Sequence, residues 1–130
     1  MVDMIRDGLQ LSGSETIVDA YAGVGTFALL LSPYANRILA IEESASAIDD
    51  AKVNLQAFKN IELIQGRTEE IFKHLPDRLH GVVLDPPRKG CAPSVLDALN
   101  KAGPDRVVYV SCDPTTLAVS YTHLTLPTKA

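Results

Sequence analysis

Residues 82–91 read VVLDPPRKGC, an apolar run followed by an acid, two prolines, two bases, a glycine and a cysteine. The run at residues 81–84 is typical of a strand that is buried on both faces of a parallel sheet. Pro86 and Pro87 have no N–H to donate and hold φ at about −65°, so they end the strand and stiffen the loop. Asp85 is therefore expected just beyond the carboxyl end of this strand, where open parallel sheets bind their ligands.

Strand-like and helix-like segments alternate on both sides of this stretch. We predict strands at residues 16–19, 37–41, 61–64, 81–84 and 106–110. We predict helices at residues 27–31, 45–58, 69–74 and 94–102, with Ser44 and Thr68 as N-caps, and the end of a helix within residues 1–10. This alternation predicts an α/β fold, a parallel sheet with right-handed crossovers and helices on both faces.

The composition fits one globular domain. The chain has 130 residues, 46% of them hydrophobic and 22% charged, against a prior of about 150 residues per domain. Its net charge of −4 lacks the basic excess that usually marks nucleic-acid binding, which counts against RNA binding by this chain alone. It has two cysteines and no apolar run near the ~20 residues that span a membrane. We expect a cytoplasmic monomer without membrane contact or a metal site.

The alternating pattern breaks after Ala118. Residues 119–130 read VSYTHLTLPTKA, which has no helix signal where the next helix is due and is similar to translated adapter sequence. We therefore expect a domain over residues 1–118 and a non-native or disordered tail over residues 119–130. The alternative is a genuine short strand followed by a tail.

A glycine loop follows the first predicted strand, where residues 19–27 read DAYAGVGTF. Gly23 and Gly25 allow a tight turn and close approach of a ligand to the backbone at the start of a helix. The third glycine of the dinucleotide-binding pattern is missing, so a dinucleotide is disfavoured. The alternative is a tight turn whose glycines serve geometry only.

Glu42 ends the second predicted strand, at the spacing where an acid binds ribose hydroxyls. A glycine loop without a third glycine, followed by such an acid, is typical of S-adenosylmethionine sites. Thr68 or Glu69, after the third strand, is expected to meet the adenine. The alternatives are a solvated charge for Glu42 and helix capping for Thr68.

A second polar loop follows the fifth strand, where residues 108–117 read VYVSCDPTTL. It should face the same pocket as the loop at Asp85, because both leave adjacent strands at one edge of the sheet. Cys112 is a candidate nucleophile there. The alternative is an inert buried cysteine, and position alone does not rank Cys112 above Cys91.

The motifs DAYAGVGTF, DPPRKG and YVSCDPTTLA, in this order, resemble the RNA uracil-C5-methyltransferases over about residues 15–118. The resemblance is greatest to the bacterial 23S ribosomal RNA enzymes, and the transfer-RNA members share the motifs. It implies a Rossmann-like S-adenosylmethionine-dependent methyltransferase fold and methylation of uridine C5 in RNA. It also implies Cys112 as the nucleophile that adds to C6 of uracil. The cofactor-binding residues that it implies are Tyr21, Gly23, Gly25, Thr26, Glu42, Glu69 and Asp85.

The sequence also departs from this family. Its members carry an RNA-binding β-barrel domain, and the general base is a glutamate expected beyond Ala118. The sheet is expected to be truncated at its C-terminal end, with the third or fifth strand left as an edge. We therefore expect the parent protein to methylate RNA and this chain to be at best a cofactor binder.

Two other functions remain open. A base-amino methyltransferase is disfavoured because Arg88 stands where such enzymes present an aromatic ring to the target base. An inactive domain that binds the cofactor, or binds nothing, is the non-enzymatic alternative.

Overall fold

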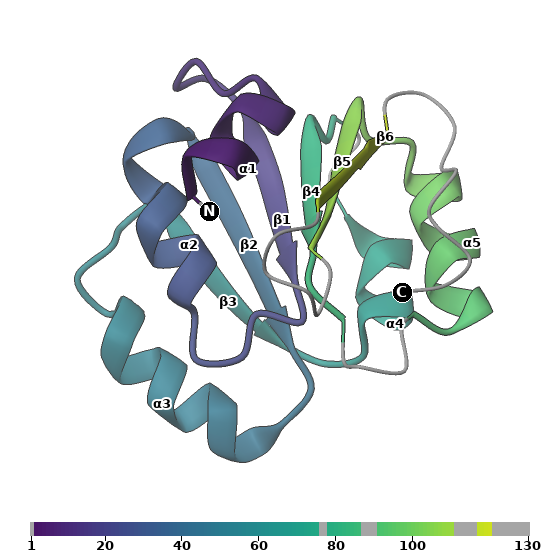
Figure 1. The fold of residues 1–130 in the computed structure, drawn as a ribbon. Coiled ribbons are helices and arrows are strands. Elements are labelled where there is room, and N and C mark those ends of the chain that lie inside the picture. The colour runs from purple at the N-terminus through teal and green to yellow at the C-terminus, as the bar shows by residue number, and fades with distance from the viewer. Residues whose placement is uncertain (1, 76–77, 87–90, 111–116, 121–130) are drawn as a thin grey trace.

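The computed structural model describes residues 2–75, 78–86, 91–110 and 117–120. Within these residues six strands form one sheet in the order β3-β2-β1-β4-β5-β6 (Figure 1). Strands β1 to β5 run parallel to their neighbours, and β6 is antiparallel to β5. The strands are β1 (Thr16–Ala20), β2 (Arg37–Glu42), β3 (Ile61–Gln65), β4 (Gly81–Leu84), β5 (Arg106–Val110) and β6 (Leu117–Ser120).

Helices cover both faces of the sheet (Figure 1). One face carries α1 (Val2–Leu9), α2 (Thr26–Leu31), the 3₁₀ helix η1 (Ser32–Tyr34) and α3 (Ala45–Leu55). The other carries α4 (Thr68–Ile71), the 3₁₀ helix η2 (Phe72–His74) and α5 (Pro93–Ala102). Successive strand residues enter opposite cores, as Val82 and Val83 do, because side chains alternate along a strand. Burial on both faces explains the continuous apolar runs in the sequence.

The predicted fold class is confirmed, and β4 and β5 begin and end where the sequence predicts. The predicted N-cap of α3 is also confirmed, since the Ser44 side chain accepts from the Ala47 N–H. Gly103 ends α5 with φ 63°, a left-handed conformation that glycine adopts without the penalty of a Cβ.

The predicted N-cap of α4 is wrong. Arg67 occupies the cap position without a side-chain hydrogen bond, and Thr68 is the first residue of the helix. Thr68 is buried, with only 5% of the residue exposed. The helix predicted at residues 69–74 is one turn of α-helix that continues as η2.

Of the two strands that the sequence predicts as edges, β3 lies at an edge of the described sheet and β5 does not. β6 pairs with β5 over Val107 to Val110, so β5 is covered and is not an edge strand. This strand includes residues on both sides of the predicted boundary at Ala118. Pairing supplies hydrogen-bond partners for an edge that would otherwise be open. The boundary itself, and the tail at residues 121–130 outside the described residues, stay predictions.

The turn between α1 and β1 is organised by one buried carboxylate. Glu15 is 8% exposed, and its side chain accepts hydrogen bonds from the Ser12 hydroxyl and from the N–H groups of Ser12, Gly13 and Ser14 at 2.8–3.1 Å. Burial alone would raise the pKa of Glu15, but these hydrogen bonds outweigh burial and lower it below its ordinary 4.5. The carboxylate therefore stabilises the turn in its ionised form.

We expect Glu15→Ala to lower the free energy of unfolding by about 2 kcal/mol, because it leaves several backbone donors unpaired. Since the folded-state pKa is lowered, this stabilisation is present above the unfolded pKa and is lost as the pH falls through the folded pKa. Urea unfolding at pH 7 and pH 3 measures both effects.

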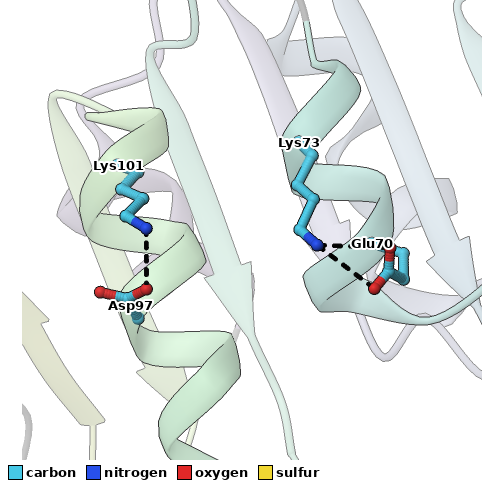
Figure 2. A network of polar contacts seen from close by, with 4 residues as sticks. All are labelled: Glu70, Lys73, Asp97 and Lys101. Atoms are coloured by element: carbon cyan, nitrogen blue, oxygen red, sulfur yellow. Dashed lines mark hydrogen bonds and ion pairs between the residues drawn. The ribbon is translucent and has the colours of Figure 1, made fainter.

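Glu70→Ala is the matched control for that variant. The Glu70 side chain is 59% exposed and pairs with Lys73 on the same helical segment at 3.4 Å (Figure 2). Exposed pairs of this kind contribute less than about 0.5 kcal/mol. Equal losses in the two variants would show that Glu15 has no special role in the turn.

Candidate functional site

The carboxyl ends of β1, β2 and β4 meet at one edge of the sheet. Ala20 is level with Ile41 of β2 and with Leu84 of β4. Tyr21, Glu42 and Asp85 therefore stand together where these strands end. The strand order reverses between β1 and β4, and open α/β sheets bind ligands at such a switch point.

The glycine loop turns sharply between β1 and α2. Tyr21, Gly23 and Gly25 have φ values of 60°, 60° and 92°, all in the left-handed region. A Cβ on Gly25 would lie 2.8 Å from Cδ1 of Leu55, so glycine is required there by both conformation and space. The Ala22 N–H donates to the Ile41 carbonyl at 2.8 Å, which ties the loop to β2.

Glu42 joins two loops through its carboxylate. Its Oε1 accepts from the Gly23 N–H and its Oε2 from the Ser44 N–H, each at 2.8 Å. A carboxylate oxygen has two lone pairs, so each oxygen keeps room for one further donor. This geometry fits a group with two neighbouring hydroxyls, and it makes Glu42 a brace of the glycine loop at the same time.

A pocket of about 410 Å³ opens between these loops, within the usual range for small ligands. It brings together three of the predicted cofactor residues, Tyr21, Glu42 and Glu69. The complete lining is Tyr21, Ile41, Glu42, Glu43, Ser44, Thr68 and Glu69.

The other predicted residues lie around this pocket without lining it. Gly23 contacts Glu42, and Gly25 is buried under the loop against Leu55. Thr26 is exposed at the start of α2. Asp85 is half-buried after β4, and burial raises its pKa.

Asp19 is an acid within β1 to which the sequence motifs assign no role. It is 1% exposed, its Oδ2 accepts from the Ala28 N–H at 3.1 Å, and its Oδ1 has no hydrogen-bond partner. Burial raises its pKa to about 7; the Ala28 hydrogen bond works against this rise, and the charges of Asp85 and Glu42 add to it. In the sequence, the signal that could have identified Asp19 is an acidic residue within an otherwise apolar strand.

Cys91 contacts Tyr21, one of the residues that line the pocket. Its thiol forms a hydrogen bond with the Tyr21 hydroxyl. Burial raises the pKa of the thiol to about 11, although this hydrogen bond works in the opposite direction. The thiolate is the nucleophilic form of cysteine, so Cys91 is a poor nucleophile near neutral pH.

A second groove of about 730 Å³ lies between the α4–η2 segment and α5. Its two lysines pair with acids of their own helical segments, Lys73 with Glu70 and Lys101 with Asp97 (Figure 2). The charged ends of both lysines are thus held by acids of their own segments, and among the predicted cofactor residues only Glu69 lines this groove. The smaller pocket at the strand ends is therefore the candidate site.

Some of the predicted chemistry falls outside the described residues. Cys112 lies there, and so do Arg88 and Lys89. The strands that carry the two motif loops, β4 and β5, are neighbours and parallel, as predicted. Among the described residues, no group of three or more His, Cys, Asp or Glu side chains could hold a metal ion. None of the helices described is long and apolar enough to cross a membrane.

A family model described as tRNA (Uracil-5-)-methyltransferase matches residues 1–129. A protein of Clostridium tetani described as an uncharacterized RNA methyltransferase is 43% identical over 113 residues. A protein of Thermotoga maritima with the same description is 37% identical over 119 residues. These matches cover 83% and 90% of this chain but 25% and 27% of the relatives, so the chain spans about a quarter of their length.

A similar solved structure is the Pyrococcus abyssi tRNA (uracil-54, C5)-methyltransferase in complex with S-adenosyl-L-homocysteine. The TM-score is 0.68 at 30% sequence identity. The match covers 86% of this chain and 28% of that chain.

Proposed function

This chain belongs to the tRNA (uracil-5-)-methyltransferase family, and we propose that it forms the cofactor-binding part of an enzyme that methylates C5 of uridine in RNA. One observation carries the proposal: the glycine loop and the Glu42 carboxylate face one pocket at the strand ends of a methyltransferase fold. The methyl donor is S-adenosylmethionine, and its product in the Pyrococcus abyssi complex supports this choice.

The residues at the pocket fit this cofactor. Glu42 has one free acceptor site on each oxygen for the two ribose hydroxyls. Tyr21 and Glu69 also line the pocket, and we assign Glu69 to the adenine. Gly23 and Gly25 let the loop take its left-handed turn beside the pocket, and Thr26 follows at the start of α2.

The cofactor supplies an electrophilic methyl group, and the chain must supply a way to make uracil C5 nucleophilic. We assign this role to the Cys112 thiolate, which adds to C6 and places the electron pair on C5. C5 then takes the methyl group, a base removes the C5 proton, and the thiolate is expelled as the double bond re-forms. We place Asp85 between the cofactor and the base, and the general base in the part of the protein beyond Ala118.

We propose RNA as the substrate and ribosomal RNA as the first class to test. Transfer RNA is the alternative, favoured by the name of the Pyrococcus abyssi enzyme. The net charge of −4 shows no basic excess, and the chain spans about a quarter of its relatives, so we assign RNA binding largely to the remainder of the protein.

Calorimetric titration of this chain with S-adenosylhomocysteine tests the cofactor half of the proposal. We expect binding in the micromolar range with a stoichiometry of one. A folded sample that shows no heat of binding would contradict the assignment of the pocket.

Tritium release from RNA labelled at C5 of uridine tests the reaction in the whole protein. Methylation at C5 must expel the label, whereas methylation of a base amino group leaves it in place. RNA with 5-fluorouridine should trap a covalent complex, because fluorine cannot leave as a proton does. Mass spectrometry should place this adduct on Cys112, and an adduct on Cys91, or none, would contradict the mechanism.

A further inference from the structure

Tyr21 and Cys91 form a contact between two loops that leave different strands. Tyr21 follows β1, and Cys91 precedes α5 in the segment after β4. The phenol and the thiol are hydrogen-bonded. Both side chains are half-buried and pack against the core cluster that contains Val95 and Leu99 of α5. The contact therefore spans the switch point of the sheet, between β1 and β4.

The backbone of Tyr21 needs such support. Its φ of 60° is left-handed, which costs a residue with a Cβ about 1–2 kcal/mol. Strained residues keep their conformation only when the surrounding structure holds them. Tyr21 also lines the pocket with Glu42 and Glu69, so a shift of its ring changes the shape of the pocket wall.

The Tyr21 hydroxyl is the polar end of a residue that lines the pocket. A half-buried hydroxyl is stabilised by a hydrogen-bond partner, and Cys91 supplies one without lining the pocket itself. The thiol stays protonated near neutral pH, because burial raises its pKa to about 11. Cys91 is thus suited to hold a neighbouring side chain rather than to attack a substrate.

We propose that Cys91 is a positioning residue, whose thiol holds the Tyr21 ring in place as a wall of the cofactor pocket. The inference rests on the proposed function, because it takes the pocket to be the S-adenosylmethionine site. Cys91 touches neither substrate nor cofactor in this role. It acts on cofactor affinity only through Tyr21.

Calorimetry with S-adenosylhomocysteine on the 130-residue chain and its variants tests the role. We expect Cys91→Ala to weaken binding about 5-fold, the effect of losing one neutral hydrogen bond. Cys91→Ser keeps a donor and acceptor and should bind within about 2-fold of the wild type. In a Tyr21→Phe background, Cys91→Ala should cause no further loss of affinity, because the hydroxyl that bonds to the Cys91 thiol is already absent.

The outcomes separate this inference from the proposed function. A wild-type chain that does not bind S-adenosylhomocysteine overturns both. A wild-type chain that binds, with Cys91→Ala binding equally well, overturns the inference alone. Additive losses from Tyr21→Phe and Cys91→Ala also overturn it, because they would show that Cys91 acts independently of the hydroxyl.

A second readout reports the contact without any ligand. The rate of iodoacetamide alkylation at Cys91 is measured against pH by peptide mass spectrometry, which distinguishes it from Cys112. The phenol stabilises the thiolate, so Tyr21→Phe should move the midpoint of this profile to higher pH. A purely packing role for Tyr21 would leave the midpoint unchanged, and that result would overturn the inference.

Discussion

We expect Glu42→Gln to weaken binding of S-adenosylhomocysteine at least 30-fold. The Glu42 carboxylate accepts from the Gly23 and Ser44 N–H groups and has one acceptor site left on each oxygen. Hydrogen bonds to a charged group contribute about 1.5–3 kcal/mol each, so losing two to ribose hydroxyls would exceed this factor. The amide also turns an N–H group toward one of the two backbone donors, which disturbs the loop.

Glu62→Gln is the matched control for this variant. Glu62 lies on the neighbouring strand β3 and does not line the pocket, its side chain is 54% exposed, and it pairs with Arg37 at 2.9 Å. Removing such an exposed pair should change the affinity less than about 3-fold. Equal effects of the two substitutions would mean that general negative charge, rather than the geometry of Glu42, governs binding.

A ligand without the ribose 2′-hydroxyl separates the two roles of Glu42. If Glu42 binds the ribose directly, the wild type should bind the 2′-deoxy analogue more weakly than S-adenosylhomocysteine. The difference in affinity between the two ligands should be smaller for Glu42→Gln. If Glu42 only braces the glycine loop, the two losses should add. Calorimetry of both ligands with both proteins measures this coupling.

We expect Asp19→Asn to flatten the dependence of stability on pH between about pH 4 and pH 7. Asp19 is buried with one carboxylate oxygen unpaired, and its pKa rises from 3.8 to about 7 on folding. Because the folded-state pKa of this acid is raised, the folded protein binds more protons than the unfolded chain in this window. Stability from Asp19 therefore falls as the pH rises from about 4 to about 7, by up to ~4 kcal/mol.

Urea unfolding of the wild type and of Asp19→Asn at pH 5, 6, 7 and 8 measures this effect. As the pH rises from 5 to 8, the free energy of unfolding of Asp19→Asn should increase relative to that of the wild type. Asp50→Asn, at an exposed position of α3, makes the same chemical change without removing a buried carboxyl group and serves as the control. Parallel profiles for the wild type and Asp19→Asn would contradict a raised pKa.

The sequence by itself determined the fold class, most element boundaries and the edge of the sheet that carries the site. Continuous apolar runs reflect burial on both faces, a property that each strand carries locally. Parallel topology then places every residue that follows a strand at one edge, which located Tyr21, Glu42 and Asp85. The family was indicated by three short motifs in a fixed order along the chain, and each motif is also a local feature of the sequence.

Only the tertiary structure decided how these residues contact one another. The hydrogen bond from Gly23 to Glu42, the contact between Tyr21 and Cys91, and the unpaired oxygen of Asp19 all depend on which strands are neighbours. The pairing of β6 with β5 is a further case, because its sequence has no strong strand pattern of its own. Such contacts follow from the order of the strands in the sheet. The hydrophobic pattern of one segment does not specify which other segment packs against it.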